Sequence, residues 1–202
     1  MNPIKHTLSA PRRMVFPGLR WASYVFLVAG VLAAGYAAYI IADSKAYQAV
    51  ELRKFNHSVP LAEPHLPIIG EVIGQIEIPA VAIKAVILHG DSPELLRRGV
   101  GHLPETPMPG EWGNVALAGH RDTFFRPLRQ LRPGEVITVR TIRGVFQYRV
   151  ESIRVVSPKD IGVLASSSRR ELTLVTCFPF HYVGAAPNRF IVRAFEVKPL
   201  TE

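Results

Sequence analysis

Cysteine is nearly absent from this sequence, which has a single thiol, Cys177, among 202 residues. One thiol cannot form a disulfide within the chain, and zinc sites that need several sulfur ligands are excluded as well. The helical HExxH zinc motif is also missing. In a protein that faces outward, a lone thiol is paired with another chain, buried, or reactive. Position alone leaves a buried structural thiol and a reactive thiol both open.

Charge is absent from residues 21–42, which form an uninterrupted apolar run. About 20 such residues span a bilayer core as a helix, so this run predicts a transmembrane anchor. Residues 1–20 lack acids and predict a basic cytoplasmic tail, whose charged residues are Lys5, Arg12, Arg13 and Arg20. The positive-inside rule then places everything after Asp43 outside a single-pass cell membrane anchor. A cleaved signal peptide is the alternative, although its apolar core usually has only about 7–15 residues.

Motifs that bind nucleic acid are also missing. The formal net charge is +8, but half of it belongs to residues 1–42, which leaves a mildly basic remainder. The basic residues of that remainder are scattered, and no helix-turn-helix, zinc-finger or base-stacking motif accompanies them. No nucleic-acid partner is therefore expected, and the membrane is the partner that composition indicates.

The residues after the apolar run predict a linker and one compact domain. Residues 43–69 are expected to form a stalk, because Pro60, Pro64 and Pro67 favour an extended chain. Residues 70–202 are rich in alternating and β-branched segments, which predicts a mostly β barrel or sandwich of seven or eight strands with short helices. The strands are predicted at 72–78, 83–88, 114–118, 135–142, 145–157, 171–177 and 189–197.

Three residues at predicted strand ends are candidates for chemistry. Cys177 ends the strand 171–177, where a sheet holds the thiol and leaves it open to a ligand. His120 follows the strand 114–118, and Gly119 is expected to give the backbone freedom to turn the imidazole outward. Arg189 opens the last strand and lies beside the thiol if that strand pairs with 171–177. A structural histidine and a surface arginine remain open as the alternatives.

Taken together, these segments resemble a known family. Ala-Gly-His at 118–120, Thr-Leu-Val-Thr-Cys at 173–177 and Arg189, in this order behind an N-terminal anchor, resemble a sortase. The stretch 99–114 also resembles the family, as does the stretch 120–125, which is similar to the class D group and its relatives. The resemblance implies a closed barrel of about eight strands, with residues 70–202 as the sortase catalytic domain. It also implies a cysteine transpeptidase.

The resemblance implies a role for each candidate residue. Cys177 is the nucleophile that cleaves a Leu-Pro-x-Thr-Gly-like sorting signal between Thr and Gly, and His120 is the general acid and base. Arg189 stabilises the oxyanion or the substrate, and Thr176 is expected to contact substrate. The implied partners are secreted proteins with a C-terminal sorting signal and an amine acceptor, such as a peptidoglycan precursor or a pilin-like subunit.

No cofactor and no metal ion are expected. Calcium-dependent sortases use acidic residues around the loop before the cysteine strand, and here the loop 158–170 has only Asp160. His102 and His181 do not match the catalytic position and are expected to be structural or peripheral. Two other functions stay open: a thiol hydrolase on the same scaffold, and a membrane-tethered β domain that binds a wall polymer while Cys177 is buried and inert.

Overall fold

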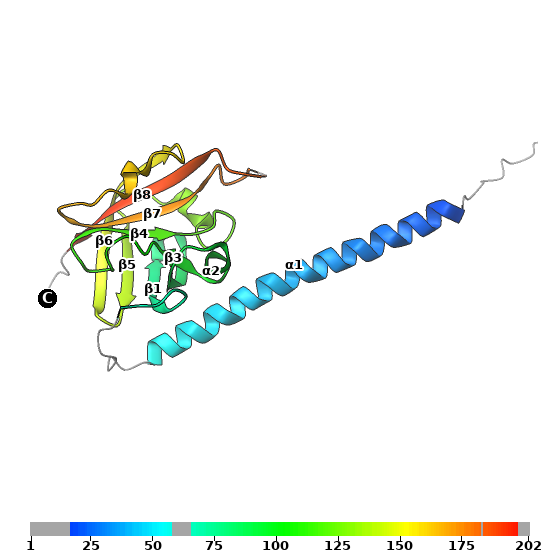
Figure 1. Cartoon of the computed structure of the whole chain (residues 1–202), viewed down its shortest axis with the longest axis horizontal. Helices are drawn as coiled ribbons and strands as arrows, with labels where there is room; N and C mark the ends of the chain where they lie inside the picture. The colour runs from blue at the N-terminus through cyan, green and yellow to red at the C-terminus, as the bar shows by residue number, and fades with distance from the viewer. Residues whose placement is uncertain (1–16, 58–65, 183, 198–202) are drawn as a thin grey trace, which may run out of the picture. The chain divides into compact units, whose positions relative to one another are not determined.

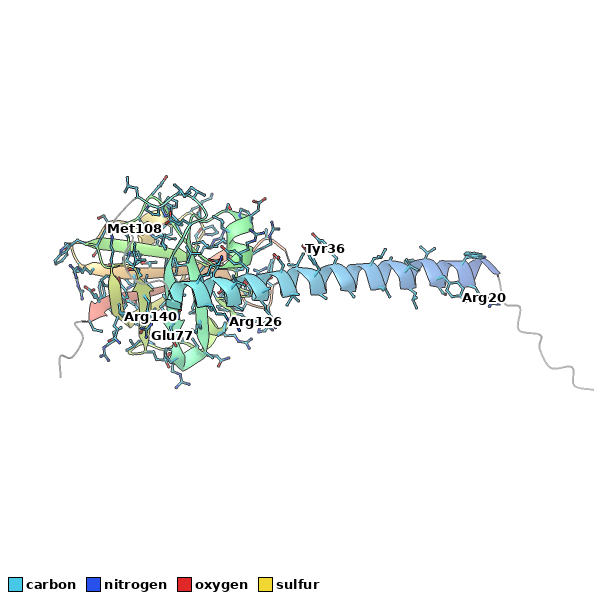
Figure 2. The ribbon with its side chains drawn as sticks, turned by 90° about the horizontal axis from the view of Figure 1, so that it is seen from below. Arg20, Tyr36, Glu77, Met108, Arg126 and Arg140 are labelled. Carbon is cyan, nitrogen blue, oxygen red and sulfur yellow. The ribbon has the colours of Figure 1, made fainter. Side chains whose placement is uncertain are left out.

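The computed structural model describes residues 17–57, 66–182 and 184–197, and the chain divides into two compact units, Met1–Ala42 and Asp43–Glu202. The first unit contains most of helix α1, Pro17–His57 (Figure 1). Within α1, the stretch Arg20–Lys54 contains a segment that is long and apolar enough to cross a membrane. Its large apolar side chains are exposed, as Figure 2 shows for Tyr36. The predicted run 21–42 therefore lies inside a helix that can serve as an anchor.

The helix continues into the second unit, and its last part contacts the β domain. The hydroxyl of Ser44 donates to the carbonyl of Arg97 at 2.9 Å. The amide group of Gln48 donates to the carbonyl of Arg98 and accepts the backbone N–H of Val86 at 3.0 Å. The predicted stalk 43–69 is therefore helical as far as His57 and partly packed, and residues 58–65 lie outside the described part of the chain.

The second unit is a closed barrel of eight strands in the described residues, in the order β1-β2-β3-β4-β7-β8-β6-β5 (Figure 1). The strands are β1 (Val72–Ile78), β2 (Ile83–His89), β3 (Val100–His102), β4 (Gly113–Ala118), β5 (Val136–Thr141), β6 (Gly144–Val156), β7 (Arg170–Phe178) and β8 (Asn188–Val197). The short helices are η1 (Pro79–Val81), α2 (Pro93–Arg98), η2 (Arg126–Gln130) and η3 (Ile161–Leu164). The predicted mostly β barrel is confirmed.

Alternation along each strand separates the barrel interior from its outer face. Leu172 and Leu174 of β7 are fully buried in the core, so the odd-numbered residues of β7 lie on the outer face. The same rule places Val192 of β8 inside and Arg189 outside. On the barrel wall, Glu77 of β1 and Arg140 of β5 form a loose ion pair of 3.9 Å (Figure 2).

Two pairings bring functional segments to one end of the barrel. Strands β4 and β7 are parallel, so the segments that follow both strands lie at the same end. Strand β8 is antiparallel to β7, so its first residues reach that end as well. The sequence-predicted strands agree with the structure to within two residues at each end, but β3 was not predicted. With three residues it is too short to show a period.

Candidate active site

Cys177 and Arg189 face each other across neighbouring strands. The two residues are Cα partners in the antiparallel register of β7 and β8, and alternation places both side chains on the outer face. The thiol is free and half-buried, as is Arg189. The guanidinium of Arg189 donates to the carbonyls of Ala186 at 3.3 Å and Asn188 at 3.1 Å, and its five N–H groups include further donors that an anion can accept from. Pairing of the last strand with 171–177, which the sequence left conditional, is confirmed.

His120 lies just after β4, at the same end of the barrel. In the parallel register Ala118 pairs with Val175, and the N–H of Gly119 donates to the carbonyl of Val175 at 3.1 Å. Strand β4 ends at Ala118 and His120 follows two residues later, so His120 lies at the end of the barrel where Cys177 lies, two residues after Val175 on β7. The imidazole is half-buried. The strand order β4-β7-β8 thus places the thiol between the histidine and the arginine.

The turn that carries His120 is held by a hydrogen bond from the buried residue Thr176. The hydroxyl of Thr176 donates to the carbonyl of Gly119 at 2.6 Å, and Thr176 is only 3% exposed. This bond holds the turn that precedes His120, and the substrate contact of Thr176 stays a prediction. Gly119 does not adopt a positive φ, and a Cβ there would lie 2.7 Å from the ring of Phe125. Close packing against Phe125, and not the expected backbone freedom, explains this glycine.

Two arginines join the loop after His120 to the loop after Cys177. The guanidinium of Arg121 donates to three carbonyls of the second loop: those of Pro179 at 3.3 Å, Tyr182 at 2.7 Å and Gly184 at 3.0 Å. Arg129 of η2 meets Nε2 of His181 at 2.9 Å. A guanidinium is suited to this task because its planar fork presents five donors. No sequence pattern predicts these contacts, because they form only when the two loops meet.

The loop between β6 and β7 is held by Asn114, near the start of β4. The side-chain amide of Asn114 donates to the carbonyls of Val163 at 3.1 Å and Ala165 at 3.3 Å, and its oxygen accepts the hydroxyl of Thr173 at 2.7 Å. Asn114 is buried, so a single side chain fastens the loop to β4 and β7.

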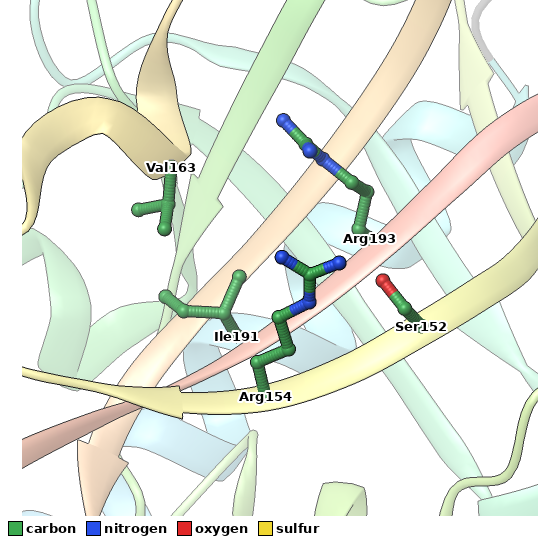
Figure 3. Close-up of a pocket in the computed structure, with 5 residues that line it drawn as sticks. All are labelled: Ser152, Arg154, Val163, Ile191 and Arg193. Carbon is green, nitrogen blue, oxygen red and sulfur yellow. The ribbon is translucent and has the colours of Figure 1, made fainter.

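A small cavity lies under this loop, next to the outer face of β8 (Figure 3). It is lined by Ser152, Arg154, Val163, Ile191 and Arg193 and has a volume of about 20 Å³. This is room for about one water molecule and too little for a substrate side chain. Arg193 also lies against the carboxylate of Glu171, an ion pair whose geometry is not that of an aligned hydrogen bond.

The other histidines of the barrel have structural partners. His102 is fully buried, its Nδ1 lies 3.1 Å from Nδ1 of His89, and its Nε2 lies 2.9 Å from the carbonyl of Pro107. Burial lowers the pKa of His102, which favours the neutral ring. His181 is exposed and contacts Arg129. Among the described residues, no three His, Cys, Asp or Glu side chains cluster as metal ligands would.

Comparison with known proteins agrees with this geometry. The family model described as Sortase domain matches residues 76–197, which is more than half of the chain. The chain belongs to the sortase family. Sortases are cysteine transpeptidases, and the resemblance stated from the motifs is confirmed.

Individual relatives support the same family. Sortase D of Bacillus subtilis is 35% identical over 127 residues, which cover 62% of this chain and 64% of the relative. Sortase A of Staphylococcus aureus is 30% identical over 205 residues, covering 89% of this chain and 99% of the relative. A solved structure of a Clostridium perfringens Sortase D5 transpeptidase is 32% identical with a TM-score of 0.64, covering 77% of this chain and 98% of that one. Sortases of class D are thus among its relatives, as the stretch 120–125 indicated.

Proposed function

We propose that this chain is a membrane-anchored sortase that cleaves a Leu-Pro-x-Thr-Gly-like signal between Thr and Gly and transfers the acyl group to an amine. The observation that supports the proposal is that Cys177 is the Cα partner of Arg189, on a strand that lies between β8 and β4, the strand that His120 follows. These three side chains supply a nucleophile, an oxyanion donor and a proton carrier at one end of one sheet face. The half-buried state of the thiol counts against the inert wall-polymer-binding alternative.

In the acylation half of the reaction, the thiolate of Cys177 attacks the carbonyl carbon of the signal's Thr. The carbonyl oxygen takes the negative charge, and the guanidinium of Arg189 donates hydrogen bonds to it. The carbon–nitrogen bond to Gly then breaks, and the imidazolium of His120 gives its proton to the departing amine. A thioester on Cys177 and a neutral His120 remain.

In the second half, an amine attacks the thioester carbon. His120 takes the proton that the amine loses, the new amide bond forms and the Cys177 thiolate leaves. The proposed acceptor is an amine of a cell-envelope molecule, either a peptidoglycan precursor or a pilin-like subunit. Water in place of the amine would yield a free acid, and this is the hydrolase alternative. Thr176 enters the proposal as a residue that holds the His120 turn.

The acceptor test uses the full chain in detergent micelles with a Leu-Pro-x-Thr-Gly peptide, with and without triglycine. Mass spectrometry then separates the amide from the acid. Transpeptidation predicts that the triglycine adduct is the main product and that Cys177→Ala forms none. If the acid dominates at saturating triglycine, the chain is a hydrolase on this scaffold. If wild type and Cys177→Ala are equally inactive and the thiol resists a methanethiosulfonate reagent, the inert binding domain is the better account.

The proposed orientation places α1 in the cell membrane, the residues before Arg20 in the cytoplasm and the barrel outside. It rests on the apolar helix and on the basic residues that precede it. The single cysteine provides a direct test. A membrane-impermeant maleimide added to intact cells should label Cys177 without permeabilisation. Labelling that appears only after permeabilisation would reverse the orientation.

A further inference from the structure

A second cleft lies at the other end of the barrel from Cys177. It has a volume of about 390 Å³ and is lined by Trp112, Arg169, Arg170, Phe195 and Glu196. These residues come from the start of β7, the end of β8 and the residue before β4. Arg170 and Cys177 are seven residues apart on one strand, which corresponds to about 23 Å. The cleft is therefore separate from the proposed active site, and its size is in the range of small-ligand sites.

The cleft combines aromatic faces with guanidinium groups. The guanidinium carbon of Arg169 lies 3.5 Å from the ring centre of Phe195, and that of Arg170 lies 5.3 Å from the ring centre of Trp112. Arg169 is exposed, and Trp112 is 69% exposed although it is one of only two tryptophans in the chain. An open indole beside cations offers a flat face for a ring and donors for an anion at once.

The charges of the cleft are not balanced. A terminal nitrogen of Arg170 forms an ion pair of 3.0 Å with Glu196, which neutralises one of the two guanidinium groups. The Nε of Arg170 is buried and has no hydrogen-bond partner among the described residues. Two cations and one carboxylate leave a net charge of +1, together with an unused buried donor. The excess charge of +1 matches one monoanionic ligand in the cleft.

We propose that this cleft binds a carboxylate carried on a ring, with the ring against Trp112 and the carboxylate against Arg169 and Arg170. A carboxylate fits better than a phosphate dianion, because it balances the single excess charge and matches the planar fork of a guanidinium. The volume exceeds that of a carboxylate alone, so the rest of the space is assigned to the ring. The ring belongs either to an acidic sugar or to an aromatic acid. This inference does not depend on the chemistry proposed for Cys177.

The experiment follows the fluorescence of Trp112. Trp21→Phe in the full chain in detergent micelles leaves Trp112 as the only tryptophan. Glucuronate, benzoate, acetate and methyl glucoside are titrated in separate arms at constant ionic strength. We expect a saturable change with glucuronate or benzoate, with a dissociation constant of about 1–10 mM. Binding should be at least about tenfold weaker with acetate, which lacks the ring, and with methyl glucoside, which lacks the charge.

Glucuronate and benzoate distinguish the two classes of ligand. Tighter binding of glucuronate indicates an acidic sugar, and tighter binding of benzoate indicates an aromatic acid. Arg169→Gln should weaken binding about tenfold or more, because it removes an exposed donor. Arg97→Gln on α2, also an exposed arginine, is the matched control and should bind like the parent. Arg170→Gln should also weaken binding, and circular dichroism shows whether this variant folds. Acetate binding as tightly as both ring acids, no saturation with either, or full binding by a folded Arg169→Gln variant would overturn the proposal.

Discussion

The hydroxyl of Thr176 donates a hydrogen bond of 2.6 Å to the carbonyl of Gly119, inside the protein. Each residue directly precedes a proposed catalytic residue, Cys177 in one case and His120 in the other. This bond therefore joins the end of β7 to the turn after β4. A change in this hydrogen bond shifts the turn that carries His120 relative to the end of β7 that carries Cys177. Thr176 and Gly119 are therefore a sensitive place to test the site.

Replacing Thr176 by Val keeps the shape of the side chain and removes the donor. The Gly119 carbonyl then loses its partner, which we expect to lower the free energy of unfolding by about 1–3 kcal/mol. Because His120 is no longer held, kcat/KM should fall about tenfold or more. Thr176→Ser keeps the hydroxyl and should retain most of the activity. Denaturant unfolding and peptide kinetics on both variants provide the check, and equal kcat/KM values for Val and Ser would refute the positioning role.

Arg121 offers an independent test of the same geometry. Arg121→Gln removes the guanidinium that binds the carbonyls of Pro179, Tyr182 and Gly184. We expect kcat/KM to fall about tenfold or more, because the loops that carry His120 and follow Cys177 lose their link. Arg126→Gln is the control, since Arg126 is exposed on η2 in the same loop region (Figure 2). If kcat/KM falls equally in Arg121→Gln and Arg126→Gln, Arg121 acts through its positive charge and not through its hydrogen bonds to the three carbonyls.

The His89–His102 pair predicts how stability depends on pH. Burial lowers the pKa of His102 below its usual value of 6.5, so the folded protein keeps this ring neutral where the unfolded chain binds a proton. Stability is therefore present above about pH 6.5 and is lost as the pH falls from there toward the lowered value. Its Nδ1 is 3.1 Å from that of His89, which leaves no room for donors on both rings.

Melting temperatures measured between about pH 8 and pH 5 test this sign. The wild-type value should fall on acidification, and His102→Gln should show a shallower fall whatever its starting stability. A wild-type curve that rises toward pH 5, or an unchanged slope in the variant, would contradict the assignment of His102 as a buried neutral ring.

The proposed chemistry also predicts a bell-shaped dependence of kcat/KM on pH. The thiolate of Cys177 must be present to attack and the imidazolium of His120 must be present to protonate the amine, so activity needs one group deprotonated and the other protonated. Rates measured across the range with a sorting-signal peptide provide the check. A profile that is flat between about pH 5 and pH 10 would show that these two groups do not work as this pair.

Much of the barrel follows from periodicity, while the contacts that complete the site do not. Alternation along 171–177 predicted a strand with Cys177 at its end, and the motif order predicted which segments work together. By contrast, Gly119 was assigned to backbone freedom, whereas its real constraint is the ring of Phe125, which lies beyond the turn. The side chains of Arg121 and Asn114 bind backbone carbonyls of distant loops. Backbone carbonyls carry no sequence signature, so such contacts appear only in three dimensions.

The most direct test of the account is the intact mass of the protein itself. The full chain is mixed with a Leu-Pro-x-Thr-Gly peptide without amine, quenched in acid and weighed, and the modified residue is located by fragmentation. The account predicts an added mass equal to the peptide through Thr, attached at Cys177, with release of the segment that begins at Gly. Cleavage of the peptide by Cys177→Ala, or an acyl group on any other residue, would contradict it.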